Sequence, residues 1–154
     1  MSISSTVRRA LVTAALGLSL VVCPTTGALA SEASPQTSNN STYDFYLGSQ
    51  GATDGTSWRS KDNATSTYIW VKSKWGYSPR LYVDGAKDTN GWNTTNCTNG
   101  GSVRAPGPGE YEIHNGVYEL GFRWARITSW ADHGSGGLGG EWSPDCQGDY
   151  ADLN

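Results

Sequence analysis

Apolar residues recur in short bursts along residues 43–154, with Gly, Asn, Asp and Pro between them. The bursts are rich in Tyr, Trp, Val and Thr, which favour extended backbone, and they do not keep a helical period. This pattern predicts an all-β protein, a small antiparallel β-sandwich or barrel. The bursts lie at residues 43–47, 57–60, 67–72, 80–83, 102–104, 110–114 and 117–127, with a last one around Trp142.

The sharpest local signal is the dipeptide Asn115-Gly116. Asn-Gly supplies two residues that accept positive φ, as a type I′ turn requires, so we expect a β-hairpin in which His114 pairs with Val117. The register assigns each side chain to a face. One face, expected to be core, holds Tyr111, Ile113, Tyr118, Leu120, Phe122 and Trp124, and the other holds Glu112, His114, Glu119 and Arg123.

Residues 1–30 have the features of an export signal. Arg8 and Arg9 supply the positive charge, residues 10–22 are apolar, and Ala28-Leu29-Ala30 matches a small-x-small cleavage site. The apolar run is too short to span a bilayer. We therefore expect a protein that is cut after this site, secreted, and not inserted in a membrane.

The remainder is expected to be one domain. Residues 31–42 contain no large apolar side chain and predict a flexible lead-in, and residues 43–154 are long enough for a single core. Without Arg8 and Arg9, nine of the 11 Lys and Arg remain against 14 Asp and Glu. This acidic balance argues against a nucleic-acid partner. We expect a monomer.

Cleavage would remove Cys23 and leave Cys97 and Cys146 in an oxidising compartment. We expect these two to form a disulfide, worth about 4 kcal/mol in the chain-entropy model. A reactive thiol or a metal ligand is the alternative, but neither cysteine has a histidine nearby in sequence. Lipidation of Cys23 in place of its removal stays open.

Glu112 and Glu119, with His114 one pair away in the expected hairpin, are the nearest approach to an acid pair or a metal site. A cation would relieve the repulsion between the carboxylates. We favour a solvated outer face, in which Arg123 supplies the counter-charge, because a flat strand face lacks the enclosing shell that metal sites need.

The second histidine, His133, lies in the glycine-rich residues 131–137 beside Asp132 and Ser135. Near-consecutive residues cannot aim at one another as a catalytic triad must, so we expect a mobile loop. Residues 88–93 and 145–152 resemble fragments of calcium loops, and a structural calcium ion stays open. We therefore expect no catalytic residues, no cofactor and no enzymatic activity.

The aromatic residues are the more informative anomaly. Seven Trp, eight Tyr and two Phe all lie beyond residue 30, and several stand beside turn-forming residues. Exposed rings with polar neighbours grip sugars and protein partners, whereas rings at the ends of a small domain can also cap its core. An extracellular protein or glycan is the expected partner. The candidate contact residues are Trp58, Arg59, Trp75, Tyr77 and Trp92.

Two resemblances add to this. Residues 59–68, Arg59-Ser60-Lys61-Asp62-Asn63-Ala64-Thr65-Ser66-Thr67-Tyr68, and residues 140–145 resemble small exported proteins of Gram-positive bacteria catalogued as a domain of unknown function. That resemblance implies a secreted β protein and brings no activity with it.

The second resemblance is that of Ser57-Trp58-Arg59 to the Trp-Arg-Tyr loop of the secreted α-amylase inhibitors of actinomycetes, although Ser60 stands where the Tyr is expected. It implies a β-sandwich that plugs an enzyme's active site. Surface binding without catalysis is thus the expected function. The alternatives are an inhibitor of a secreted glycoside hydrolase, with Trp58 and Arg59 as contacts, and a bacteriocin-like factor.

Overall fold

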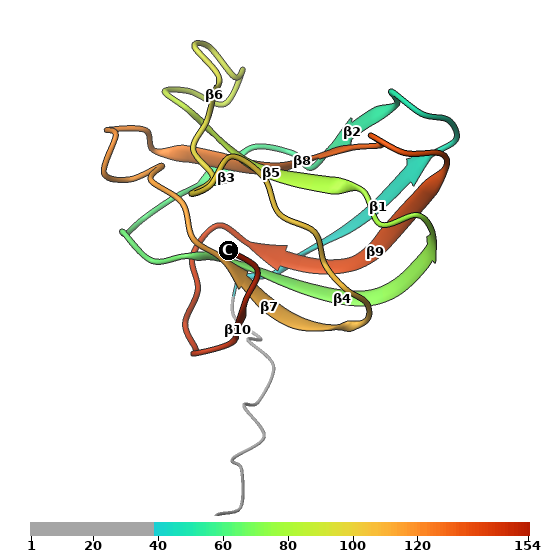
Figure 1. Cartoon of the computed structure of the whole chain (residues 1–154). Coiled ribbons are helices and arrows are strands. Elements are labelled where there is room, and N and C mark those ends of the chain that lie inside the picture. Colours follow the sequence, from blue (N-terminus) through green and yellow to red (C-terminus); the bar gives the residue numbers. More distant parts are fainter. Residues whose placement is uncertain (1–38) are drawn as a thin grey trace, which may run out of the picture. The chain divides into compact units, whose positions relative to one another are not determined.

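The computed structural model describes residues 39–154, so the expected export signal, Cys23 and most of the expected lead-in lie outside the described residues (Figure 1). Within the described part, the regular elements are strands, which confirms the all-β prediction. No helix that could cross a membrane occurs in it. The strands are β1 Ser41–Leu47, β2 Thr53–Gly55, β3 Arg59–Ser60, β4 Thr67–Gly76, β5 Arg80–Ala86, β6 Thr95–Asn96, β7 Gly109–Ile113, β8 Trp124–Trp130, β9 Gly136–Ser143 and β10 Ala151–Asp152.

The strands form two sheets, seen as two layers in Figure 1. Sheet A has the order β1-β9-β4-β7-β10, and sheet B has the order β2-β8-β5-β6 with β3 also paired to β8. All strand pairs are antiparallel except β10 with β7, which is parallel. Strands β7 and β8 are consecutive in the chain but belong to different sheets.

One hydrophobic core draws side chains from both sheets. In β1 the buried Tyr43, Phe45 and Leu47 alternate with exposed residues, as expected for a strand with one face on the core. Burying an aliphatic side chain of this kind contributes about 1.5–3 kcal/mol. Other members of the core are Ile69, Val71, Leu81, Val83, Ile113, Ile127, Leu138 and Trp142.

The ordered β structure begins slightly before the expected domain boundary. Ser41 and Thr42, assigned to the lead-in from the sequence, already pair with Trp142 and Glu141 of β9. Their small polar side chains carry no hydrophobic signal, but backbone pairing does not require one.

The glycine-rich segment is the largest difference from expectation. Gly136 and Gly137, assigned to a mobile loop from the sequence, begin strand β9, which lies between β1 and β4 in sheet A. A Cβ at Gly140 would overlap the Trp70 carbonyl oxygen, and one at Gly137 would overlap the Phe45 carbonyl oxygen. These glycines are in the strand because they permit close approach of the neighbouring backbones.

The expected hairpin around Asn115-Gly116 is wrong. Strand β7 pairs with β4 and β10, so both of its edges are occupied. Instead of entering a type I′ turn, the buried Asn115 donates its Nδ2–H groups to Thr67 Oγ1 at 3.1 Å and to the Ile113 carbonyl at 3.0 Å. The chain then forms tight turns over residues 117–121 and crosses to sheet B.

The core assignments that depended on this hairpin are correct only in part. Ile113 and Phe122 are buried, as expected. Leu120, however, is 62% exposed because it lies in the turns that replace the second hairpin strand.

The expected disulfide is also wrong. Cys97 and Cys146 are both free and buried. Cys97 donates its backbone N–H to Val83 of sheet B, whereas Cys146 lies just beyond the end of β9 of sheet A and its thiol donates to the Gly148 carbonyl at 3.4 Å. The two thiols therefore belong to opposite layers, and the core holds the layers together without a cross-link.

A buried ion pair joins the β3–β4 connection to the end of β9. Lys61 is almost fully buried, and its Nζ lies 3.2 Å from Asp145 Oδ1. The same ammonium donates to the carbonyl of Pro144 at 2.7 Å and to the carbonyl of Thr65. Burial lowers the pKa of Lys61, but these acceptors and Asp145 compensate the ammonium inside the protein.

Candidate functional site

The outer face of sheet A carries an open cluster of aromatic side chains. Tyr46 of β1 and Trp75 of β4 are both exposed, and both are register partners of Gly137 of β9. Their ring centroids lie 5.1 Å apart with an interplanar angle of 32°. A Cβ at Gly137 would overlap the Trp75 indole nitrogen, so glycine is what lets this ring lie over the middle strand.

Tyr77 lies at the same end of sheet A, just after β4. Its backbone N–H donates to the Ser135 carbonyl at 3.0 Å, next to the start of β9. Tyr77 is 53% exposed, and its ring contacts His133 edge-on at a centroid distance of 5.3 Å. Tyr46, Trp75 and Tyr77 are referred to below as the aromatic platform.

Polar side chains border the platform. The neighbouring outward-facing row of sheet A consists of Asp44, Gly139 and Ser73, which are register partners across β1, β9 and β4. A Cβ at Gly139 would come within 2.7 Å of Ser73 Oγ and 3.4 Å of Asp44 Oδ1. The two rings that flank Gly137 are therefore followed, one row along the strands, by the hydroxyl and the carboxylate that flank Gly139. In both rows the β9 position between the two side chains is a glycine.

A network of arginines supports the Tyr77 side of the platform. The Arg104 guanidinium lies 5.6 Å from the Tyr77 ring centroid and binds Asp132, which also accepts a hydrogen bond from Arg80 at 2.8 Å. Desolvation raises the pKa of Asp132, but the hydrogen bonds from Arg80 and Arg104 outweigh this and lower it to about 2. Asp132 is thus an ionised anchor for Arg104 beneath the ring.

The other half of the same outer face is covered. After β9, residues 144–154, referred to below as the C-terminal arm, return to form β10 beside β7 (Figure 1). Tyr68 of β4 is fully buried although it is the register partner of the outward-facing Glu112. The ring of Tyr150 on the arm covers it at a centroid distance of 4.8 Å.

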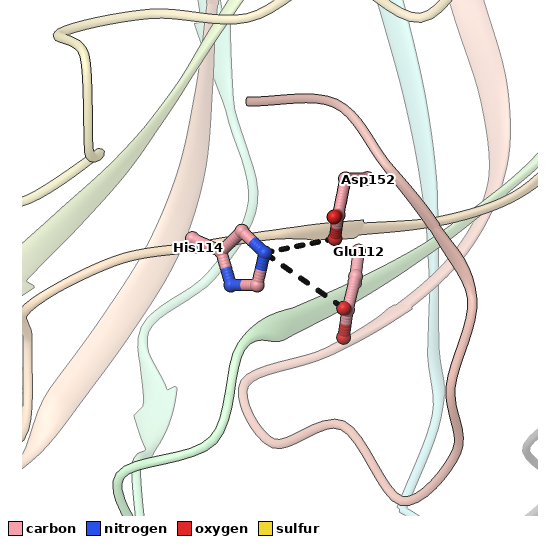
Figure 2. A group of neighbouring side chains, drawn as sticks. All are labelled: Glu112, His114 and Asp152. Carbon is pink, nitrogen blue, oxygen red and sulfur yellow. Dashed lines mark ion pairs between the residues drawn. The ribbon is translucent and has the colours of Figure 1, made fainter.

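Three ionisable side chains meet where the arm joins β7 (Figure 2). Nε2 of His114 lies 2.8 Å from Asp152 Oδ1 and 3.9 Å from Glu112 Oε1. Burial, followed by the hydrogen bond to Asp152, raises the pKa of Glu112. Glu112, His114 and Asp152 are referred to below as the His–carboxylate cluster.

The sequence analysis correctly expected Glu112 and His114 to lie close together, but the third residue beside them is Asp152 and not Glu119. Glu119 is exposed in the turns that replace the expected hairpin strand, and Asp152 of β10 takes its place beside His114. The parallel pairing of β10 with β7 brings Asp152 opposite Glu112. Nothing in the local sequence of residues 145–152 indicates this pairing.

Of the five predicted contact residues, Trp75 and Tyr77 lie at the same end of sheet A, Trp75 in β4 and Tyr77 just after it. Trp92 is 69% exposed, but it lies in the β5–β6 connection, where Asp88 Oδ1 accepts its backbone N–H at 3.1 Å. That connection belongs to sheet B. Tyr46 was missed by the sequence analysis, although its place between the core residues Phe45 and Leu47 points it outward.

Trp58 and Arg59 are half-buried and already have partners inside the protein. The Arg126 guanidinium lies 4.6 Å from the Trp58 ring centroid. Arg59 lies over the Trp142 ring and donates to the Trp142 carbonyl at 3.4 Å. Arg59 also lines a groove of about 570 Å³ together with Asn40, Ser41, Thr42, Ser57 and Trp142.

Comparison with known proteins gives a family and no activity. No curated protein and no solved structure matches the chain. A family model described as a protein of unknown function, DUF2712, matches residues 28–146, which include the aromatic platform, Glu112 and His114 and end before Asp152. The chain belongs to this DUF2712 family.

Proposed function

We propose that the protein is a secreted, non-catalytic β-sandwich protein that binds an extracellular glycan through the aromatic platform. The observation that carries the proposal is the row Tyr46–Gly137–Trp75, in which two exposed rings flank a strand position without a side chain. Sugar rings bind to flat apolar surfaces with polar groups at their edge. Asp44 and Ser73 supply such groups in the next row.

The shape of the surface favours a glycan over a folded protein partner. A stable protein interface buries about 800 Å² on each side and has a broad apolar centre. Here the apolar part is limited to a few rings at one end of a sheet, and the adjoining rows are polar or charged, including the exposed Lys72–Glu141 ion pair. A narrow strip of rings beside polar groups suits a chain of sugars.

Affinity electrophoresis in gels that contain soluble polysaccharides tests this proposal. We expect at least one polysaccharide to retard the wild-type protein, and Trp75→Ala to lose about tenfold in affinity, equivalent to about 1.4 kcal/mol. Trp92→Ala is the matched control, because Trp92 is an exposed tryptophan away from the platform. Equal retardation of wild type and Trp75→Ala, or a loss confined to Trp92→Ala, would contradict the proposal.

Inhibition of a secreted glycoside hydrolase is the alternative, and Trp58 and Arg59 are its contact residues. The contacts of these residues with Arg126 and Trp142 weigh against it, because binding a target enzyme would have to break them. Titration of an α-amylase with the protein decides between the two. A stoichiometric loss of amylase activity that Trp58→Ala abolishes would favour the inhibitor, and growth inhibition of neighbouring bacteria at low dose would favour the bacteriocin-like factor.

A further inference from the structure

The C-terminal arm ends on a short attachment to β7. The parallel pairing of β10 with β7 covers only two residues of each strand. Beyond it, the Leu153 N–H donates to the Glu112 carbonyl at 3.0 Å, and Asn154 Oδ1 accepts the His114 N–H at 2.9 Å. The His–carboxylate cluster lies at this attachment, with two members on the β7 side and one on the arm (Figure 2).

The donor atoms of the cluster are close enough to share one ion. One donor atom from each of Glu112, His114 and Asp152 lies within 4.8 Å of the others. Ligands at about 2.1 Å around a tetrahedral metal ion are about 3.4 Å apart. His114 Nε2 lies 2.8 Å from the Asp152 carboxylate and 3.9 Å from the Glu112 carboxylate, on either side of that spacing. Small rotations of the two carboxylate side chains would bring both distances to the spacing of metal ligands.

The imidazole is oriented as a metal ligand requires. Nδ1 of His114 lies 2.8 Å from Ser66 Oγ, which comes from the segment before β4. This contact directs Nε2 toward Asp152 and Glu112. A hydrogen bond from the far ring nitrogen fixes the ring and its tautomer in most histidine metal sites.

The charge of the cluster is not compensated by Lys or Arg. The ion pairs of Glu112 and Asp152 within residues 39–154 are those with His114, which is cationic only when protonated. Two adjacent carboxylates with a neutral imidazole leave a net negative charge that a divalent cation neutralises.

We propose that Glu112, His114 and Asp152 bind a divalent transition-metal ion of the Zn²⁺ class, which clips the C-terminal arm onto sheet A. Imidazole and carboxylate together suit Zn²⁺, whereas Ca²⁺ and Mg²⁺ take oxygen ligands. Three protein ligands leave one coordination position for water. The ion would hold the arm against sheet A, with Tyr150 over Tyr68 and Leu153 against the core. It does not depend on the glycan proposal.

Isothermal titration of the tag-free, metal-stripped chain with Zn²⁺ alone tests the site. We expect one Zn²⁺ per chain, with affinity reduced at least tenfold in His114→Ala and in Asp152→Asn. His133→Ala is the matched control, since His133 is the other histidine and lies outside the cluster, and it should bind as the wild type does. Ser66→Ala, which keeps all three ligands, should lose about tenfold.

The Asp152→Asn variant keeps the test independent of folding, because that side chain is 57% exposed. Zn²⁺ should also slow hydrogen exchange of the Leu153 amide in the wild type and not in Asp152→Asn. Equal Zn²⁺ affinity in wild type and Asp152→Asn, binding that His133→Ala removes, or a Ca²⁺ affinity equal to that for Zn²⁺ would each overturn the proposal. So would an absence of Zn²⁺ binding by wild-type chain whose folding is verified by circular dichroism.

Discussion

The two halves of the outer face of sheet A are built in opposite ways. At the β1–β9–β4 end, the side chains of Tyr46 and Trp75 lie open to solvent over the glycines of β9. At the β4–β7–β10 end, the C-terminal arm adds a further layer that buries Tyr68 completely. The same sheet face therefore has aromatic rings in both halves, but the protein itself covers only one half.

This difference separates stability from function. A ring covered by another part of the chain contributes its burial to folding. A ring left open contributes little to folding, and exposed apolar clusters on soluble proteins mark sites of interaction. Variants of the covered half should therefore lower the stability of the protein, whereas variants of the open half should lower binding and leave stability nearly unchanged.

The largest effect is expected at the root of the C-terminal arm. Asp145→Ala leaves the buried Lys61 ammonium without its counter-charge, and breaking a buried pair in this way costs about 3–5 kcal/mol. Urea denaturation measures the loss. Lys72→Met is the control, because the Lys72–Glu141 pair is exposed and should contribute less than about 1 kcal/mol. Similar losses in both variants would mean that the Lys61 pair is not shielded from water.

The glycines of β9 are expected to have the next largest effect. Gly140→Ala places a Cβ on the Trp70 carbonyl oxygen and should destabilise the protein by about 1–3 kcal/mol or more through overpacking. Gly107→Ala is the control, since a Cβ there would meet nothing within 4 Å. Comparing the thermal unfolding midpoints of the two variants separates the clash with the Trp70 backbone from the general effect of replacing a glycine. Equal midpoints would show that β9 has room for side chains.

A smaller effect is expected from paired ring deletions in the two halves. Tyr150→Ala should lower the free energy of unfolding by about 1–2 kcal/mol, because it uncovers Tyr68. Trp75→Ala should change it by less than about 1 kcal/mol, because that ring is partly solvated already. Chemical denaturation compares them, and a greater loss for Trp75→Ala would reverse the roles assigned to the two halves.

The smallest effect at neutral pH concerns the thiols. Since Cys97 and Cys146 are free, reducing agent should leave the unfolding midpoint unchanged, and two thiols should titrate in denaturant in the chain cleaved after Ala30, which lacks Cys23. Burial raises the pKa of Cys146 from its ordinary 9.0 to about 11. The stability that comes from burying the protonated Cys146 thiol is therefore fully present below pH 9 and is lost as the pH rises from about 9 to 11. An unfolding midpoint that falls when reducing agent is added would show that Cys97 and Cys146 form a disulfide after all.

The sequence predicted the parts of the fold that depend on alternation of side chains. β1, β4 and β5 each contain buried residues at every second position over part of their length, and all three were expected as strands, whereas β8 overlaps only the end of the expected burst at residues 117–127. The burst expected around Trp142 lies in β9, but the first part of β9, residues 136–140, was missed because its glycines carry no hydrophobic signal, and the reason for them is the approach of β1 and β4 in space. That approach is a long-range property.

The site shows the same limit. Trp75 and Tyr77 were predicted as contact residues and are exposed, because aromatic residues beside turns can be recognised locally. The place of Tyr46 between Phe45 and Leu47 is a local signal for an outward-facing ring, but its position beside Trp75 across β9 is a long-range property. Asp152 was missed because its partner strand β7 is far away in sequence. The prediction of a turn at Asn115-Gly116 was wrong for a related reason. The buried hydrogen bonds from the Asn115 side chain to Thr67 and Ile113 outweigh the local preference for a turn.

The central claim is that the open half of the outer face binds a glycan. Chemical-shift mapping of the ¹⁵N-labelled protein, titrated with a soluble fragment of the polysaccharide that retards it in gels, tests this most directly. We expect the largest shifts at the amides of Gly137 and Gly139 and at the Trp75 indole N–H, with little change at Glu112 and Leu153. Shifts centred on Trp92, on Arg59 or on the C-terminal arm would contradict the claim.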